Sequence, residues 1–153
     1  MSKIIEVYHK GERYEVLVDD DLVLPKRIFK QGKYFGFKIN GKNIYLHRWV
    51  IGVTDKKIQV DHINNNKLDN RKENLRVCTN QQNSANKIVK GYYLHKGSRK
   101  WMARIKIDYK SKYLGSYDTP EEAQQVYRKA HAEAFGEFSP YYEYYSGITK
   151  EVN

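Results

Sequence analysis

Hydrophobic and polar residues alternate in several short stretches near the start of the chain, a pattern typical of strands with one buried face. Three runs alternate in this way: residues 14–18, residues 32–39 and residues 43–46. The Asn40-Gly41 pair separates the last two runs, and Asn-Gly in that position favours a tight hairpin. We therefore expect residues 1 to about 46 to form short strands, with a solvated turn at the three aspartates of 19–21, and a short helix at 47–51.

The pattern changes in the middle of the chain, where two short apolar runs flank a long polar loop. Residues 58–60 and 75–78 predict strands, and the segment between them is crowded with asparagine. Thr79 and Gln82 then have the spacing of a capping box, in which Thr79 is the N-cap of a following helix. The sequence therefore predicts a strand, loop, strand and helix, a ββα unit, between residues 58 and 86.

After Lys90 three more strands are expected, at residues 92–95, 100–107 and 112–117, with turns at Gly97-Ser98 and at 109–111. In the middle strand Trp101, Ala103, Ile105 and Ile107 share one face, while Met102, Arg104 and Lys106 share the other. We expect the first face to be buried and the second to be basic and exposed.

A helix is predicted after these strands. Thr119 as N-cap, Pro120 at the first helical position and Glu122 at the third form a start signal, and Gly136 is the expected stop. The predicted apolar stripe of this helix is made of mostly small residues that allow close packing on a sheet: Ala123, Val126, Tyr127, Ala130 and Ala134. The fold class is therefore α+β, with a first domain at 1–89, a second at 90–145 and a tail at 146–153.

Composition and charge narrow the class of partner. The net charge is +10, and the segment from 90 to 113 alone carries +7, which favours a polyanion. Fourteen tyrosines among basic residues suit nucleic acid better than a membrane surface. Cys78 is the single cysteine, so a disulfide within the chain is excluded, and we expect it to be a small buried residue. No apolar run is long enough to span a membrane, and the start lacks the core of a signal peptide, so a soluble, cytoplasmic protein is expected.

The polar loop contains residue types that suit phosphodiester hydrolysis. Asp61 and His62 are adjacent in a predicted strand, so their side chains leave on opposite faces. Asn74 lies 13 residues after Asp61, and Asn83 lies 22 residues after Asp61. Asp61 and Asn83 offer oxygen ligands of the kind Mg²⁺ prefers, His62 could accept a proton, and Asn74 could fix the imidazole or the loop. Alternatively, the asparagines simply form a polar, turn-rich loop.

These residues resemble the HNH endonucleases of the phage homing type. The resemblance is carried by Leu46-His47-Arg48, Val60 to Asn64, Leu68 to Arg71, Glu73 to Arg76 and Gln82-Asn83. It implies a ββα-metal fold, one divalent ion (Mg²⁺, or else Mn²⁺) on Asp61 and Asn83, His62 as general base and Asn74 as an orienting residue. The chain has Asn83 where many members carry a histidine; phage homing members often have an asparagine at this position.

A second resemblance, from about Lys90 to Tyr141, is to the AP2 DNA-binding domain. It is carried by 100–106, by 113–119 and by 121–123. The resemblance implies three strands and a packed helix, with the sheet in the DNA major groove. The residues expected to bind DNA are Tyr93, His95, Arg99, Arg104, Lys106 and Tyr113.

Together these observations predict a site-directed DNA endonuclease of the homing type that acts on double-stranded DNA, as a monomer that nicks one strand, in a bacterial or phage-infected cell. The alternative is a DNA-binding or regulatory protein whose nuclease site has decayed. His47, Arg48 and Arg76 are candidates for phosphate contacts or for structural roles, and for His47 we favour structural packing or a contact with the backbone.

Overall fold

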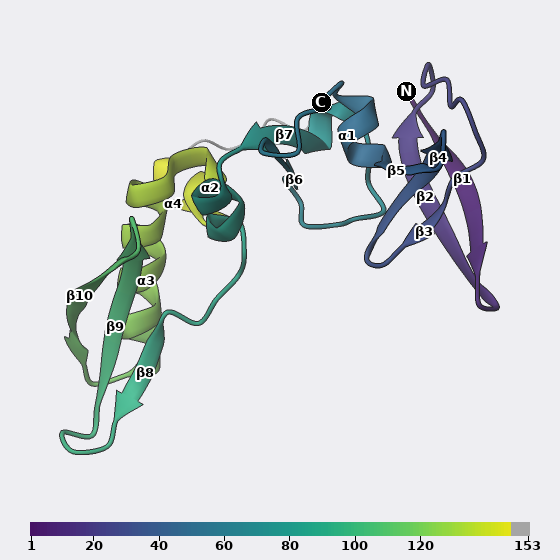
Figure 1. Cartoon of the computed structure of the whole chain (residues 1–153). Coiled ribbons are helices and arrows are strands. Elements are labelled where there is room, and N and C mark those ends of the chain that lie inside the picture. Colours follow the sequence, from purple (N-terminus) through teal and green to yellow (C-terminus); the bar gives the residue numbers. More distant parts are fainter. Residues whose placement is uncertain (148–153) are drawn as a thin grey trace. The chain divides into compact units, whose positions relative to one another are not determined.

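The structure, a computed structural model, describes residues 1–147, which form two compact units (Figure 1). Unit 1 is Met1–Asn80 and unit 2 begins at Gln81; each is described separately below, unit 2 as far as residue 147. Strands in small antiparallel sheets combine with helices in both, so the predicted α+β class is confirmed. None of the described helices is long and apolar enough to cross a membrane. The predicted boundary at residue 89 stays a prediction, as does the tail, of which 148–153 lie outside the described residues.

Unit 1 contains three small antiparallel sheets. β1 (Ser2–His9) pairs with β2 (Glu12–Asp19), and β6 (Gln59–His62) pairs with β7 (Leu75–Cys78). The third sheet has the order β3-β4-β5, formed by Phe29–Gln31, Tyr34–Ile39 and Lys42–Tyr45. The short helix α1 (Leu46–Val50) follows β5, and the 3-10 turn η1 (Lys72–Asn74) precedes β7. The predicted hairpin, short helix and ββ pair are thus confirmed, and α2 (Asn80–Ala85) begins where the third element of the ββα unit was expected.

The alternating pattern of the N-terminal strands produces one hydrophobic core in unit 1. Its most buried members come from β2, β4 and α1, namely Val16, Val18, Phe37 and Leu46. The β4–β5 hairpin turns at Asn40-Gly41, both with positive φ, as a type I′ turn requires. Val60 and Leu75 join the same core, so β6 and β7 are held against the N-terminal strands.

The polar loop between β6 and β7 is pinned to the edge of β2. The amide of Leu17 donates to the carbonyl of Leu68, and the amide of Asn70 donates to the carbonyl of Leu17, both at 2.8 Å. The Asp19 carboxylate accepts a hydrogen bond from the amide of Lys72 at 2.9 Å. Asp19 was expected in a solvated turn, but this bond gives it a definite structural role as an anchor for the loop.

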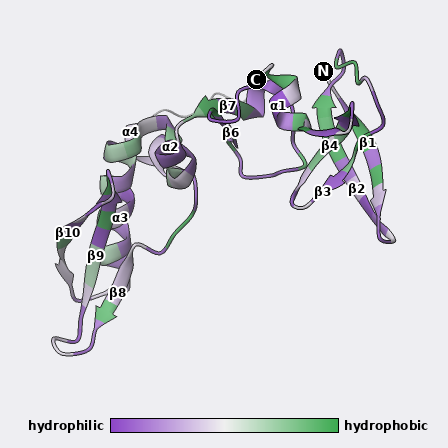
Figure 2. Ribbon diagram, in the orientation of Figure 1, coloured by the Kyte–Doolittle hydropathy of each residue, from purple (hydrophilic) through white to green (hydrophobic). Residues whose placement is uncertain are grey.

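Unit 2 is a three-stranded antiparallel sheet covered on one face by a helix (Figure 1). The strand order is β10-β9-β8, formed by Lys110–Tyr117, Lys100–Ile107 and Tyr92–His95, and the helix is α3 (Pro120–Phe135). Ala103 and Ile105 are buried while Arg104 and Lys106 are exposed, which confirms the predicted faces of β9. Hydrophilic and hydrophobic residues both occur along this strand (Figure 2). The 3-10 turn η2 (Gly136–Phe138) and α4 (Tyr142–Ser146) follow α3.

The start and the stop of α3 are those that the sequence predicts. Thr119 is the N-cap, Glu122 completes the capping box and Gly136 is the C-cap. The predicted stripe needs one correction, because Ala134 is exposed. The row that faces the sheet repeats every four residues through Ala123, Tyr127 and His131, and it continues to the partly buried Phe135 rather than to Ala134.

Two further details differ from or extend the expectations. The β9–β10 turn lies at Asp108 and Tyr109, which both have positive φ, so Lys110 and Ser111 belong to the strand instead of the turn. His131 is buried, bonds to Ser139 Oγ at 2.8 Å through Nδ1, and burial lowers its pKa to about 4. Cys78 is buried, as expected, and burial raises the pKa of its thiol.

Candidate active site

The β6–β7 pair places the Asp61-His62 dipeptide on a fixed backbone. Asp61 lies opposite Arg76 in the register and His62 lies opposite Leu75. Successive side chains of a strand leave on opposite faces, and these two residues indeed have different partners. Asp61 is 2% exposed and His62 is fully buried. Both side chains are therefore held in a protected environment within the part of the chain expected to carry the chemistry.

The Asp61 carboxylate forms an ion pair with Arg76. Oδ2 accepts from Nη2 at 3.1 Å and from Nε at 3.3 Å. A buried carboxylate needs a positive partner, since burial of an isolated charge is costly. Arg76 thus has a structural role in addition to any phosphate contact.

The donors proposed for a divalent ion fit such an ion chemically. Asp61 supplies a buried carboxylate that already has a cationic neighbour, and Asn83 supplies an amide oxygen; both are hard oxygen donors. Asn83 lies on α2, half-buried, in unit 2, and its pairing with Asp61 stays a prediction. Within residues 1–147 no group of three or more His, Cys, Asp or Glu side chains could hold a metal. Water and substrate oxygens would have to complete the coordination.

Asn70 fixes the orientation of the His62 ring. The Asn70 amide nitrogen donates to the carbonyl of Lys67 at 3.1 Å, which turns its Oδ1 toward His62 Nε2 at 3.2 Å. Oδ1 can only accept a hydrogen bond, so Nε2 of the neutral ring carries the proton. The lone pair of His62 is therefore on Nδ1, an atom that is itself buried, so a water molecule has to enter the site before it can give a proton to this atom.

His62 belongs to a cluster of rings with His47 and two tyrosines. The centroid distances are 5.2 Å from His62 to His47, 6.2 Å from His62 to Tyr34 and 5.7 Å from His47 to Tyr45. Burial, and then the positive charge of Lys67, lower the pKa of His62 to about 4. Burial, and then the neighbouring His62, lower the pKa of His47 to about 3. Both imidazoles are thus neutral at pH 7, the state a general base requires.

Asn74 organises the loop rather than bonding to the imidazole in this structure. Its Oδ1 accepts from the amide of Asn64 at 3.0 Å, and its Nδ2 donates to Asn64 Oδ1 at 2.9 Å and to the carbonyl of Asp69 at 2.8 Å. Asp69 also accepts from Arg71 at 2.8 Å and 2.7 Å. Of the two functions predicted for Asn74, these bonds correspond to fixing the loop. The asparagine-rich segment is therefore a turn-rich loop and the scaffold of the candidate site at once.

His47 and Arg48 extend the site toward α1. His47 is buried in the ring cluster described above, as expected for structural packing. Arg48 donates to the carbonyl of Ile58 at 2.7 Å and to the carbonyl of Asp55. These bonds hold the segment that leads into β6, and a phosphate contact by Arg48 stays a prediction.

The exposed face of the unit 2 sheet contains a row of Tyr93, Arg104 and Tyr113. Arg104 lies opposite Tyr113 in the register, and its guanidinium carbon is 6.0 Å from the ring centroid of Tyr113 and 5.8 Å from that of Tyr93. Lys106 lies on the same strand face, 5.9 Å from the Tyr109 ring. Stacked and cationic side chains on an open face are typical of nucleic-acid contacts.

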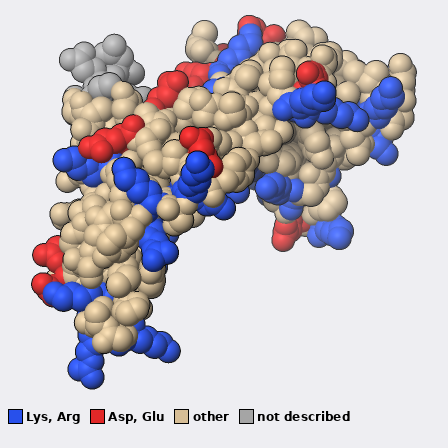
Figure 3. All heavy atoms as spheres, turned by 60° about the vertical axis from the view of Figure 1, so that its left-hand side comes forward, with Lys and Arg blue, Asp and Glu red and all other residues tan. Residues whose placement is uncertain are grey.

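The remaining predicted DNA contacts are near the β8–β9 turn. His95 lies opposite Lys100 in β9 and bonds to Ser98, with 3.1 Å from Nδ1 to Oγ. Arg99 is in the turn with positive φ, and its amide donates to the carbonyl of His95. Lys and Arg side chains project from this end of the sheet (Figure 3). The structure thus places five of the six predicted residues on one face of the sheet and Arg99 in the turn beside it.

Sequence reasoning missed two residues beside His62. Asn70 was one asparagine among many, and Tyr34 lay in a predicted strand far from the loop. The sequence did contain a signal for Asn70. This residue lies directly after Asp69 and eight residues beyond His62, in a loop whose two ends were predicted to be strands, so the loop could bring Asn70 back toward His62. No signal in the sequence pointed to Tyr34, because its contact with His62 depends on the packing of β4.

Comparison with known proteins points to the same segment of the chain as the location of the candidate site. Residues 45–85 match the family model described as HNH endonuclease, and this segment contains Asp61, His62, Asn74 and Asn83. A protein of Acanthamoeba polyphaga mimivirus, named as an uncharacterized HNH endonuclease, is 36% identical over an alignment of 104 residues. The alignment covers 61% of this chain and 54% of the relative. The chain therefore spans about half the length of the curated relative it matches. No solved structure matches. Residues 45–85 are therefore similar to HNH endonucleases.

Proposed function

We propose that the protein is a DNA endonuclease of the HNH type that depends on a divalent metal ion. The observation that carries this proposal is the buried Asp61-His62 pair at the end of β6, inside the segment that matches the HNH endonuclease model. In the proposed form it is a homing-type enzyme that acts as a monomer in a bacterial or phage-infected cell and nicks double-stranded DNA. A single ββα site acts on one strand at a time, which is why nicking is expected.

His62 is the general base in the proposed reaction. Its neutral ring takes a proton at Nδ1 from a water molecule, and the oxygen of that water attacks the scissile phosphorus. Asn70 holds the opposite nitrogen, so the ring cannot turn its protonated side to the water. The bond from phosphorus to the 3′ oxygen breaks and the leaving oxygen takes up a proton from solvent, which gives a 5′-phosphate and a 3′-hydroxyl.

Asp61 and Asn83 hold the ion in this proposal, with Mg²⁺ as the preferred metal and Mn²⁺ as a substitute. A bound divalent ion supplies positive charge where negative charge develops on the phosphate and the leaving oxygen. Arg76 holds the Asp61 carboxylate in place through its two bonds to Oδ2. Asn74 keeps the loop closed over β6 and β7 through its bonds to Asn64 and Asp69.

Unit 2 is the DNA-binding part in this proposal and is AP2-like. Support comes from its three strands and single packed helix, and from the row of Tyr93, Arg104 and Tyr113 on the face opposite α3. Phosphate contacts by the basic residues would supply affinity and register, and a few base contacts would supply specificity.

Removing the metal should abolish cleavage and spare binding. We expect the protein to convert a supercoiled plasmid library with randomised inserts to nicked circles in Mg²⁺, and to leave it intact in excess EDTA, because Asp61 and Asn83 alone provide no Lewis acid. Gel electrophoresis and strand-resolved end mapping measure the product. DNA binding without nicking in either Mg²⁺ or Mn²⁺ would contradict the proposal and favour the decayed, DNA-binding alternative.

Arg104→Ala should weaken DNA binding without unfolding unit 2. Loss of one phosphate contact lowers the slope of log affinity against log salt by about 0.9. Fluorescence anisotropy on a labelled duplex, at several salt concentrations and without divalent metal, measures this slope. Lys129→Ala is the matched control, since Lys129 is exposed on α3. If both variants bind DNA like the wild type, the DNA does not lie on this face of the sheet.

A further inference from the structure

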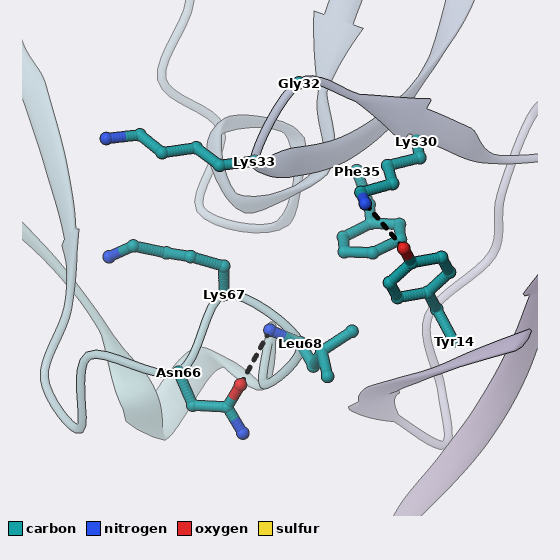
Figure 4. A pocket seen from close by; sticks show the side chains of 8 residues that line it. All are labelled: Tyr14, Lys30, Gly32, Lys33, Phe35, Asn66, Lys67 and Leu68. Atoms are coloured by element: carbon teal, nitrogen blue, oxygen red, sulfur yellow. Dashed lines mark hydrogen bonds between the residues drawn. The ribbon is translucent and has the colours of Figure 1, made fainter. Parts of the chain in front are cut away.

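A basic hollow lies beside the polar loop between β6 and β7, within unit 1 (Figure 4). Its volume is about 450 Å³, and it lies between the β3–β4 turn and the loop residues 66–68. Three of its lining residues are lysines: Lys30, Lys33 and Lys67. No acidic residue is among those that line it, so the hollow suits an anion.

The three lysines are not equivalent. Lys30 Nζ lies 2.6 Å from the Tyr14 hydroxyl and 4.2 Å from the centroid of the same ring, so Tyr14 fixes its position. Lys33 and Lys67 extend side by side in the same direction (Figure 4). Their ammonium groups lie 5.3 Å and 5.9 Å from the ring centroid of Tyr34. Two like charges beside one ring repel each other, and an anion bound between them would remove that repulsion.

The backbone that supports these lysines is held firmly. Lys33 follows Gly32, whose φ of 63° forms the tight turn between β3 and β4. Lys67 precedes Leu68, whose carbonyl is bonded to β2. The Asn66 side chain accepts a hydrogen bond from the Leu68 amide at 3.0 Å (Figure 4). The hollow is thus preorganised, which lowers the cost of binding a ligand.

The hollow is also adjacent to the proposed general base. The Tyr34 ring, whose centroid lies 5.3 Å and 5.9 Å from the two ammonium groups, is nearly parallel to the His62 ring, with 18° between the planes and 6.2 Å between the centroids. Lys67 and Asn70 are bonded through the Lys67 carbonyl, and Asn70 bonds to His62 in turn. An anion held by Lys33 and Lys67 would therefore lie within one side chain of the catalytic imidazole.

We propose that Lys33, Tyr34 and Lys67 form a subsite for a backbone phosphate of the DNA substrate, next to the phosphate that is cleaved. The inference rests on the proposed nuclease function and adds the residues that would hold the strand at the site. The two ammonium groups bind the phosphate oxygens, and the Tyr34 ring offers a stacking surface to the adjoining sugar or base.

The double variant Lys33→Ala/Lys67→Ala tests the subsite. The slope of log affinity against log salt should fall by about 1.8, or about 0.9 for each lysine, in anisotropy measurements on a duplex without divalent metal. The control is Lys56→Ala/Lys57→Ala, which removes two exposed lysines of the same unit from outside the hollow. Equal slopes for the two double variants would overturn the proposal, because total charge alone would then explain the loss.

Two further measurements separate this inference from the nuclease proposal and from a site for free phosphate. If the wild type nicks DNA and the Lys33/Lys67 variant nicks and binds equally well, the subsite is wrong and the nuclease stands. If the wild type never nicks but the slopes differ as stated, the nuclease fails and the phosphate contact stands. NMR signals of the Tyr34 ring should shift when duplex DNA is added at micromolar concentration. Inorganic phosphate should shift the same signals only when it is added at millimolar concentration. Equal response to both ligands would indicate a site for free phosphate and overturn the assignment to DNA.

Discussion

His62→Ala should lower the rate of DNA nicking by about 10²- to 10⁴-fold, the usual contribution of a general base. The reason is that the neutral His62 ring presents a lone pair at Nδ1 while Asn70 holds Nε2. The low pKa of about 4 means that the ring is neutral at pH 7, so raising the pH above neutrality should add little activity through this residue. Single-turnover plasmid nicking, measured from pH 5 to pH 8, gives the rate and its pH profile.

Folding and binding must be measured for the same variant, because His62 is buried and its removal leaves a cavity. DNA affinity should stay within about twofold of wild type, and the fluorescence of Trp49 in unit 1 should show a folded protein. His9→Ala is the histidine control in β1, where no loss of rate is expected. Asn70→Ala should give a smaller loss than His62→Ala, since the ring remains but can adopt either tautomer. A folded His62→Ala protein that nicks at the wild-type rate would exclude His62 as the base.

Gly91→Ala should destabilise unit 2 by about 2 to 4 kcal/mol, the combined cost of a strained backbone and an overpacked contact. Gly91 has a φ of 68°, and an added Cβ would lie 2.2 Å from the Tyr127 ring of α3. Tyr127 is buried and cannot move away without leaving the core it shares with Ala103. For a domain of this size the melting temperature should fall by roughly 10 °C or more.

The two tryptophans allow the melting of unit 2 to be observed alone. Trp49 is in unit 1 and Trp101 is in β9, so thermal unfolding followed by fluorescence in a Trp49→Phe background reports on unit 2. Gly97→Ala is the control, because the nearest atom to an added Cβ there is 3.2 Å away, on the exposed His95 side chain. A Gly91→Ala protein that melts with the control would show that Tyr127 does not pack on Gly91 in solution.

Local patterns were sufficient to predict most of the elements. The strands of unit 2 follow from the alternation of hydrophobic and polar residues, and the helix α3 follows from its capping box and its terminal glycine. All of these signals lie within a few residues of one another in the sequence. The stripe of α3 was wrong at Ala134 because helical spacing gives two compatible rows, and only packing on the sheet selects the one through His131.

The candidate site was only partly predictable. Asp61 and His62 could be identified from residue type and spacing, since the chemistry of hydrolysis restricts which side chains can serve. The environment of His62 could not, because Tyr34 and His47 reach it through the packing of β4 and α1. The bonds of Asn70 to His62 and of Asn74 to Asn64 also depend on the path of the loop, because eight and ten residues separate the two partners.

The hydrogen bonds between the polar loop and β2 determine how much of the chain must be transferred to another protein for the candidate site to keep its structure. The matched segment begins at residue 45, yet the loop that carries Asn70 is held by backbone bonds to Leu17 and by Asp19. A fragment that starts at the match would lack the edge on which this loop is ordered. Recombination that preserves the site must therefore carry the N-terminal hairpin along with the motif, so the smallest transferable piece is unit 1 together with α2, which carries the proposed ligand Asn83.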